Sequence, residues 1–166
     1  MLKVDVGLDS PHEYAMGISV AEIINNVHGK KSGAVAAIVD GVQVDLSYEI
    51  HSDCEVLPIL NSSDEGLYII RHSCAHLLAQ AVLEFFPNAK PTIGPPIEHG
   101  FYYDFHMVAP SEEELRSIEK RMKQLVKQNL KVEREEYNIE TLREMFADNQ
   151  FKIEIMDEKI GEGSGS

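Results

Sequence analysis

The hydrophobic pattern of the chain changes its period at one polar segment, and this change limits what the chain can fold into. Before Asn61-Ser-Ser-Asp-Glu-Gly66, apolar residues fall in short runs that are typical of strands. After this segment, they recur every three or four residues over long stretches, which is typical of helices. A polar segment between two such patterns indicates a boundary. We therefore predict an α+β protein with a domain at 1–61, a linker at 62–66 and a second domain at 67–166.

The first domain is predicted to begin with a strand followed by a helix. Apolar residues alternate with charged ones over residues 2–6, which is the period of a half-buried strand. Ser19 and Glu22 have the spacing of a capping box, in which each side chain satisfies a free backbone donor of the other residue. This box predicts a helix at 21–27, and Gly29 is a natural end for it.

A hairpin is predicted next in the same domain. Asp40-Gly41 lies between two β-branched runs, 34–39 and 42–46, and both turn positions of such a hairpin need positive φ. A last strand is predicted at 54–60, at the edge of the sheet, because Pro58 has no N–H to donate. The order of these elements is that of a ubiquitin-like β-grasp fold.

The second domain is predicted to mix helices with strands. The expected elements are a helix at 67–86, a strand at 101–106, a helix from Ser111 to about Leu130, a short helix at 141–147 and a strand at 151–156. Ser111 and Glu114 form a second capping box. The core stripe of the helix that follows is predicted at Leu115, Ile118, Met122 and Leu125. The helix at 67–86 is apolar on two sides, which predicts an interior helix.

The composition narrows the class of protein. Apolar residues make up 43% of the 166 residues, as in globular domains, and charges interrupt the apolar runs too often for a membrane-spanning helix. Two cysteines in no paired motif argue against a disulfide scaffold and for a reducing compartment, so we expect a cytoplasmic protein. The net charge of −13 would repel a polyanion, so any contact with nucleic acid must be local.

Two histidines form the strongest candidate site. His72 and His76 are four residues apart, so they share one face of the predicted helix. Two imidazoles near neutral pKa can bind a metal ion, or hold a water molecule beside a carbonyl group. Cys74 points to the opposite face, and His99 and His106 are further ligands only if the fold brings them close. A structural pair that hydrogen-bonds to a neighbouring strand is the alternative.

Three motifs resemble the editing domain of threonyl-tRNA synthetases. They are His72-Ser-Cys-Ala-His-Leu-Leu78, Ile93-Gly-Pro-Pro-Ile97 and Gly100-Phe-Tyr-Tyr-Asp104, and Glu119-Lys-Arg-Met122 also looks like this family. The first 60 residues are similar to the family's N-terminal TGS module, a β-grasp domain, and the order of the domains agrees. The resemblance covers nearly the whole chain and implies a TGS domain followed by a partial α+β editing domain, the family's second additional domain.

The resemblance also implies roles for individual residues. Catalytic roles fall on His72, His76 and Lys152, and substrate contacts on Tyr103, Gly94 and Pro95. The histidines would position or deprotonate the attacking water, and the lysine would stabilise the developing oxyanion or help to order the water. Two of these residues have plainer alternatives, since Tyr103 could be core and Lys152 could be a solvated charge on an edge strand.

The implied reaction is hydrolysis of Ser-tRNA(Thr). Serine lacks one methyl group of threonine, which is worth only ~1–3 kcal/mol in a pocket, or about 10–200-fold. A second site that hydrolyses the wrong ester supplies the missing discrimination. The implied partner is the acceptor end of tRNA(Thr), and the lysine stripe of the predicted third helix could face its stem. The stripe consists of Lys120, Lys123, Lys127 and Lys131, and the alternative is a solvated face that pairs with Glu119, Glu133 and Glu135.

The chain departs from the family in one respect. It contains no Asp-x-Cys-x-Gly-Pro-His segment, which completes the family's editing pocket, and no aminoacylation core. We therefore expect a fragment of the ligase with little or no activity of its own and no cofactor. ATP, Mg²⁺ and Zn²⁺ are implied for the core alone, as is homodimerisation of the parent enzyme.

Two other functions are compatible with parts of the sequence. TGS domains also occur as RNA-binding or protein-binding modules of regulatory enzymes, but those proteins are not expected to carry the motifs between His72 and Asp104. Zinc-dependent alanyl-tRNA editing hydrolases use a similar HxxxH helix, in which His72 and His76 would bind the metal, but the later Cys-x-x-x-His pair of that class is absent.

Overall fold

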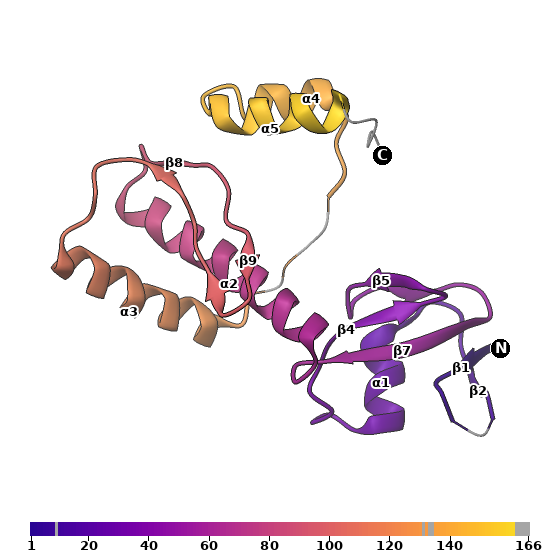
Figure 1. The fold of residues 1–166 in the computed structure, drawn as a ribbon. Helices are drawn as coiled ribbons and strands as arrows, with labels where there is room; N and C mark the ends of the chain where they lie inside the picture. The colour runs from indigo at the N-terminus through magenta and orange to yellow at the C-terminus, as the bar shows by residue number, and fades with distance from the viewer. Residues whose placement is uncertain (9, 131, 133–134, 162–166) are drawn as a thin grey trace. The chain divides into compact units, whose positions relative to one another are not determined.

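The computed structural model describes residues 1–8, 10–130, 132 and 135–161, and the chain divides into two compact units, Met1–Arg71 and His72–Ser166 (Figure 1). The division falls inside helix α2 (Asp64–Phe85). The polar loop before this helix is shorter than predicted, because α2 already begins at Asp64. Ser63 explains this start, since its Oγ accepts a hydrogen bond from the N–H of Gly66 at 3.0 Å.

A five-stranded mixed sheet forms the centre of the first unit. The strands are β1 (Leu2–Asp5), β2 (His12–Tyr14), β4 (Ala34–Val39), β5 (Val42–Val44) and β7 (Cys54–Leu60), and their order across the sheet is β2-β1-β7-β4-β5. β1 and β7 are parallel, and the other neighbours are antiparallel. A separate short pair, which the sequence did not predict, joins β3 (Ile18–Ser19) to β6 (Glu49–Ile50).

Helix α1 (Val20–His28) supplies one side of the core of this unit. The predicted capping box of Ser19 and Glu22 is present, and the helix ends at Gly29, whose φ is +79°. Ile23 of α1 and Val4 of β1 are both fully buried in the same cluster. The amphipathic pattern of the sequence therefore has its expected counterpart in the packing of this unit.

The hairpin turn confirms one prediction about this sheet, and β7 corrects another. Asp40 and Gly41 have φ values of +47° and +83°, as the Asp-Gly turn requires. The edge position predicted for the last strand is wrong, because β7 lies between β1 and β4. Pro58 is nevertheless tolerated, since β1 pairs only with Cys54 and Glu55 at the start of β7. Beyond these two residues β7 is locally an edge.

The second unit is built on two helices. The C-terminal part of α2 packs with α3 (Glu112–Gln128) around a core of Ala81, Val82, Ala89, Ile118 and Leu125. Arg121 of α3 donates two hydrogen bonds to the carboxylate of Glu84 on α2, one of them at 3.0 Å. The capping box predicted at the start of α3 is present. The prediction that Leu115 belongs to the core stripe is wrong, since this residue is 52% exposed.

Short strand pairs follow α2 in the second unit. They are β8 (Lys90–Pro91) with β11 (Phe105–His106), and β9 (Pro96–Ile97) with β10 (Gly100–Phe101). The single strand predicted at 101–106 is therefore interrupted in its middle. The alternation typical of a strand is still present, because Phe101, Tyr103 and Phe105 are partly buried while the residues between them are exposed.

Two helices close the described part of the chain. α4 (Ile139–Met145) agrees with the predicted short helix. The strand predicted at 151–156 is wrong, since these residues belong to helix α5 (Gln150–Gly161). The main-chain oxygen of Asn149 accepts hydrogen bonds from the N–H groups of Lys152 and Ile153, which begins this helix. None of the helices described is long and apolar enough to cross a membrane.

Candidate active site

Two imidazoles lie in direct contact on α2. The Nε2 atoms of His72 and His76 are 2.9 Å apart, and their rings meet edge to face with centroids 4.5 Å apart. The contact follows from the helix itself, because residues four apart lie one above the other. One imidazole donates and the other accepts, so one Nε2 of the pair is without its proton. The predicted pair is thus formed, and both histidines are exposed.

The surroundings favour the neutral form of His76. Burial lowers the pKa of His76 below 6.5, and the charges of His72 and Lys152 lower this pKa further. A neutral imidazole that is accessible at pH 7 can accept a proton from water. The site therefore has the properties of a general base.

Lys152 reaches this site from α5, about 80 positions further along the chain. Its ammonium group donates a hydrogen bond to the main-chain oxygen of Thr92 at 3.2 Å. The side chain is partly buried, and this burial lowers the pKa of Lys152 from 10.5. The lysine is therefore not the solvated charge of an edge strand. It is a helix residue whose charge acts on His76.

The three residues predicted to contact substrate lie in the connections between the short strands. Gly94 and Pro95 come just before β9, and Tyr103 lies between β10 and β11. Tyr103 is stacked on Phe105 with ring centroids 4.8 Å apart, and burial raises the pKa of its hydroxyl group. A Cβ on Gly94 would lie 2.3 Å from the Tyr103 ring, so only glycine fits against this face of the ring. Pro95 follows in the loop before β9 and is partly buried.

A groove opens beside His76 in the second unit. It has a volume of ≈ 400 Å³ and runs between α2 and the end of α3. The lining residues are Ser73, His76, Leu77, Gln80, Leu125, Val126, Asn129, Leu130 and Val132. His76 therefore has open space next to it, which a histidine packed inside a core would lack.

The other predicted ligands and contacts do not join the site. His99 is exposed and lies 3.7 Å from Glu98, while His106 is in contact with the ring of Phe151 at a centroid distance of 5.7 Å. Cys74 is a free cysteine. In the part of the chain that the structure describes, no three His, Cys, Asp or Glu side chains are grouped closely enough to hold a metal ion.

The structure describes three of the four residues of the lysine stripe. Lys120, Lys123 and Lys127 are exposed, whereas Lys131 and Glu133 lie outside the described residues. Lys123 pairs with Glu119 on the same helix, which agrees with the solvated alternative for this position.

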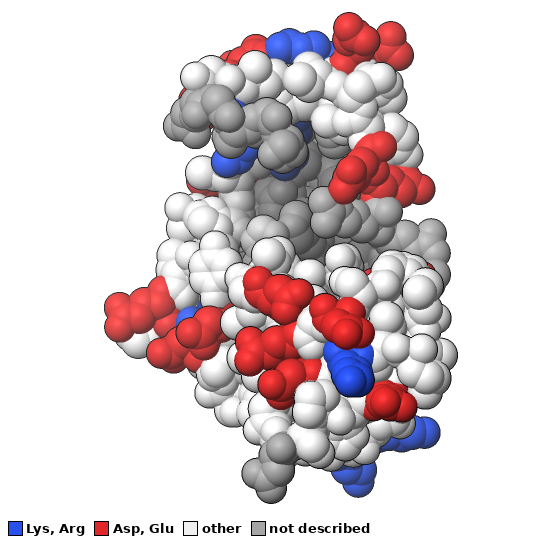
Figure 2. All heavy atoms as spheres, turned by 90° about the vertical axis from the view of Figure 1, so that its right-hand side faces the viewer, with Lys and Arg blue, Asp and Glu red and all other residues white. Residues whose placement is uncertain are grey.

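Figure 2 shows a face of the molecule on which acidic side chains predominate over basic ones. Local positive surface is therefore scarce there.

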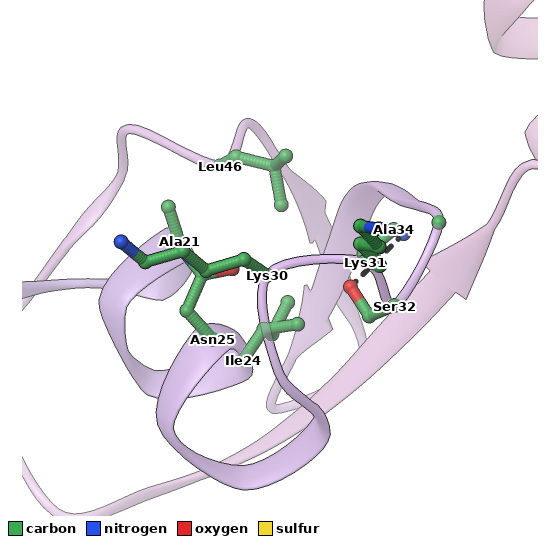
Figure 3. A pocket seen from close by; sticks show the side chains of 9 residues that line it. Ala21, Ile24, Asn25, Lys30, Lys31, Ser32, Ala34 and Leu46 are labelled. Atoms are coloured by element: carbon green, nitrogen blue, oxygen red, sulfur yellow. Dashed lines mark hydrogen bonds between the residues drawn. The ribbon is translucent and has the colours of Figure 1, made fainter.

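The first unit has a hollow of its own. It has a volume of ≈ 380 Å³ and lies at the end of α1 (Figure 3). Lys30 extends along one side of the hollow past Ala21 and Asn25, and Lys31 and Ser32 lie on the other side. No pair of groups suited to acid–base chemistry lines this hollow, so the histidine site of the second unit is the better candidate for catalysis.

Sequence reasoning missed two residues that shape the site. Thr92 accepts the hydrogen bond of Lys152, and its own N–H and Oγ1 both donate to the main-chain oxygen of Asp104, next to Tyr103. Asn149 donates to the main-chain oxygen of Pro91 at 3.0 Å. Neither residue belongs to a motif. Their hydrogen bonds involve main-chain oxygens, and a sequence pattern does not reveal which main-chain oxygens lie nearby.

The fold and the site together define a class of protein: a mixed α/β chain of two units, the second of which carries a histidine–lysine site suited to proton transfer. Curated relatives named threonine–tRNA ligase match the chain. The one from Thermotoga maritima is 40% identical over 164 residues, covering 96% of this chain and 25% of its own length. Those from Azoarcus sp. and Thermoplasma acidophilum are 52% and 42% identical, covering 71% and 81% of this chain.

The extent of these matches limits what they show. The chain spans about a fifth to a quarter of the length of the curated relatives it matches. No family model matches the chain. The chain is therefore similar, over most of its length, to one part of threonine–tRNA ligases.

Proposed function

We propose that the chain is the N-terminal region of a threonine–tRNA ligase, consisting of a TGS-type β-grasp domain and a partial editing domain. The sheet order β2-β1-β7-β4-β5, with α1 against one face, supports the β-grasp assignment of the first unit. The histidine motif on α2 and the Gly94–Tyr103 contact support the editing assignment of the second unit. ATP, Mg²⁺ and Zn²⁺ would then be bound by the aminoacylation core of the parent enzyme, through which it would also dimerise in the cytoplasm.

The proposed activity of the second unit is hydrolysis of the ester that joins serine to the terminal ribose of tRNA(Thr). One observation carries this proposal: His76, in contact with His72, lies beside an open groove, and the charge of Lys152 acts on His76. His76, whose neutral form is favoured by partial burial of its ring, would take a proton from the attacking water while His72 orients it. The Lys152 cation would stabilise the oxyanion that develops at the ester carbonyl.

The test measures deacylation of Ser-tRNA(Thr) by the full-length protein that contains this chain. His76→Ala should lower kcat about 10²–10⁴-fold, which is the usual contribution of a positioned acid or base, and His72→Ala should also lower kcat, because it removes the residue that orients the water. The matched control is His51→Ala, since His51 is an exposed histidine of the first unit whose side chain lies near Glu49. Unchanged hydrolysis by His72→Ala would remove the proposal.

A metal measurement separates this function from a zinc-dependent editing hydrolase. One equivalent of tightly bound zinc in the purified chain, absent from its His76→Ala variant, together with loss of hydrolysis by the full-length protein on chelation, would favour the zinc enzyme. Hydrolysis that survives complete chelation would favour the histidine–lysine mechanism.

A further inference from the structure

Two side chains at the start of α5 are bonded to consecutive backbone carbonyls of another segment. Asn149 Nδ2 donates to the oxygen of Pro91 at 3.0 Å, and Lys152 Nζ donates to the oxygen of Thr92 at 3.2 Å. Both hydrogen bonds are partly buried. The beginning of α5 is therefore attached at two successive points, the last residue of β8 and the residue that follows it.

Asn149 does not act as an ordinary helix cap. An asparagine just before a helix normally accepts a hydrogen bond from the N–H of the second or third helical residue through its side-chain oxygen. Here the N–H groups of Lys152 and Ile153 donate to the main-chain oxygen of Asn149, as in any helix start, but no N–H of the described residues donates to its side-chain oxygen. The side-chain oxygen is buried and has no hydrogen-bond partner in the described part of the chain. The amide group thus serves the bond to Pro91 rather than the helix.

We propose that Asn149 is a positioning residue that clamps the start of α5 to Pro91 and thereby sets the place of the Lys152 ammonium group. The ammonium group of a lysine lies at the end of a flexible four-carbon stem. The backbone of α5 must therefore be held close to Thr92 if the Lys152 ammonium group is to keep its place. The clamp also reaches the substrate side of the site, because Thr92 is bonded to Asp104 next to Tyr103. The catalytic consequence rests on the proposed function, whereas the clamp itself does not.

The charges around Lys152 show what displacement of α5 would change. Burial lowers the pKa of Lys152, and the charge of Lys152 in turn lowers the pKa of His76. His106 lies near the same element through its contact with Phe151. If the clamp is lost and α5 moves outward, Lys152 gains solvent and its pKa rises toward that of the unfolded chain.

The test substitutions are Asn149→Ser and, as a matched control, Asn138→Ser. Serine is as good a helix cap as asparagine but is too short to reach Pro91. Asn138 is a true cap, since its side-chain oxygen accepts a hydrogen bond from the N–H of Thr141 at 2.8 Å. Asn149→Gln is the second variant. It keeps an amide group on a longer stem, so its Lys152 modification and its kcat should lie between those of the native protein and those of Asn149→Ser.

Two readouts are needed, both on the full-length protein. The first is the pH dependence of Lys152 modification by an amine-reactive reagent, followed by peptide mass spectrometry. The second is kcat and KM for Ser-tRNA(Thr) hydrolysis. Asn149→Ser should raise the midpoint of Lys152 modification toward the value in the unfolded chain and lower kcat about tenfold, with KM changed less than about twofold. Asn138→Ser should leave both unchanged.

The two proposals fail in different ways. If Asn149→Ser behaves like Asn138→Ser in both readouts, Asn149 is not a clamp. A loss of kcat with an unchanged modification profile would also overturn the inference, because the residue would then act by another route. If the native protein does not hydrolyse Ser-tRNA(Thr), the proposed function fails, and the modification profile alone decides whether the clamp exists.

Discussion

Replacing Gly94 with alanine tests the packing on which the tyrosine side of the site depends. A Cβ at this position would lie 2.3, 2.7 and 2.8 Å from three atoms of the Tyr103 ring. Real Cβ atoms essentially never approach other heavy atoms so closely, so either the ring or the backbone of Gly94 must move. The ring is not free to swing away, because its other neighbour is Phe105, stacked at a centroid distance of 4.8 Å.

The magnitude follows from the kind of clash. An added methyl group that forces packed neighbours to shift costs about 1–3 kcal/mol of unfolding free energy. The backbone contributes nothing further, since Gly94 is not among the glycines with positive φ. The cost of Gly94→Ala should fall to within about 0.5 kcal/mol in a Tyr103→Ala background, because the atoms that clash are then gone.

The assay is urea denaturation followed by far-ultraviolet circular dichroism. The transition of the second unit is recognised as the one that Ile118→Ala shifts, since Ile118 is only 3% exposed in its core. Gly161→Ala is the matched control: among the described residues beyond its own helix backbone and chain neighbours, no atom lies within 4 Å of a Cβ there, and the residue ends α5. Gly161→Ala should be neutral or stabilising by about 0.4–1 kcal/mol.

Two results would refute this reasoning. A loss of stability for Gly94→Ala no larger than that of Gly161→Ala would mean that the ring does not pack on Gly94. An equal loss in the native and Tyr103→Ala backgrounds would mean that the clash is with another group.

Three further predictions concern charge and backbone. Burial and nearby charges hold the pKa of His76 below 6.5, so the unfolded chain binds this proton more readily. Stability should therefore fall as the pH drops below about 6.5 and level off below the folded pKa. The free energy of unfolding, measured by urea titration, should differ less between pH 5 and pH 7 in His76→Gln than in the native protein. Arg121→Ala should lower the melting temperature more than Arg116→Ala, because Arg121 joins two helices through Glu84 whereas the partner of Arg116 is on its own helix; equal shifts would contradict this. Gly41→Ala should cost about 1 kcal/mol in a urea titration, since φ is +83° at this turn position; no loss would show that the turn relaxes.

Predictions from the sequence succeeded where a few neighbouring residues decide the outcome. The capping boxes at Ser19 and Ser111 are present because each involves groups only three residues apart. The Asp40-Gly41 turn formed for the same reason. The His72–His76 contact also needed only a helix, which the apolar pattern of the segment already indicated.

Predictions failed where short patterns had two readings. Residues 151–156 alternate like a strand over six positions, yet they are helical. Two of them have partners far away in the sequence, since Phe151 contacts the ring of His106 and Lys152 bonds to the main-chain oxygen of Thr92. The edge position of β7 was inferred from Pro58 alone, while the sheet order depends on pairing with β1 and β4, which are far away in the sequence.

The sequence by itself determined the local parts of this protein: its caps, its hairpin turn and the face on which two imidazoles meet. Only the tertiary structure decided that Lys152 is a helix residue beside them and that Asn149 and Thr92 hold this arrangement together. The physical reason is that local hydrogen bonds are chosen by adjacent residues. The docking of α5 depends instead on burial and on backbone carbonyls about 60 positions away, which leave no pattern in the chain.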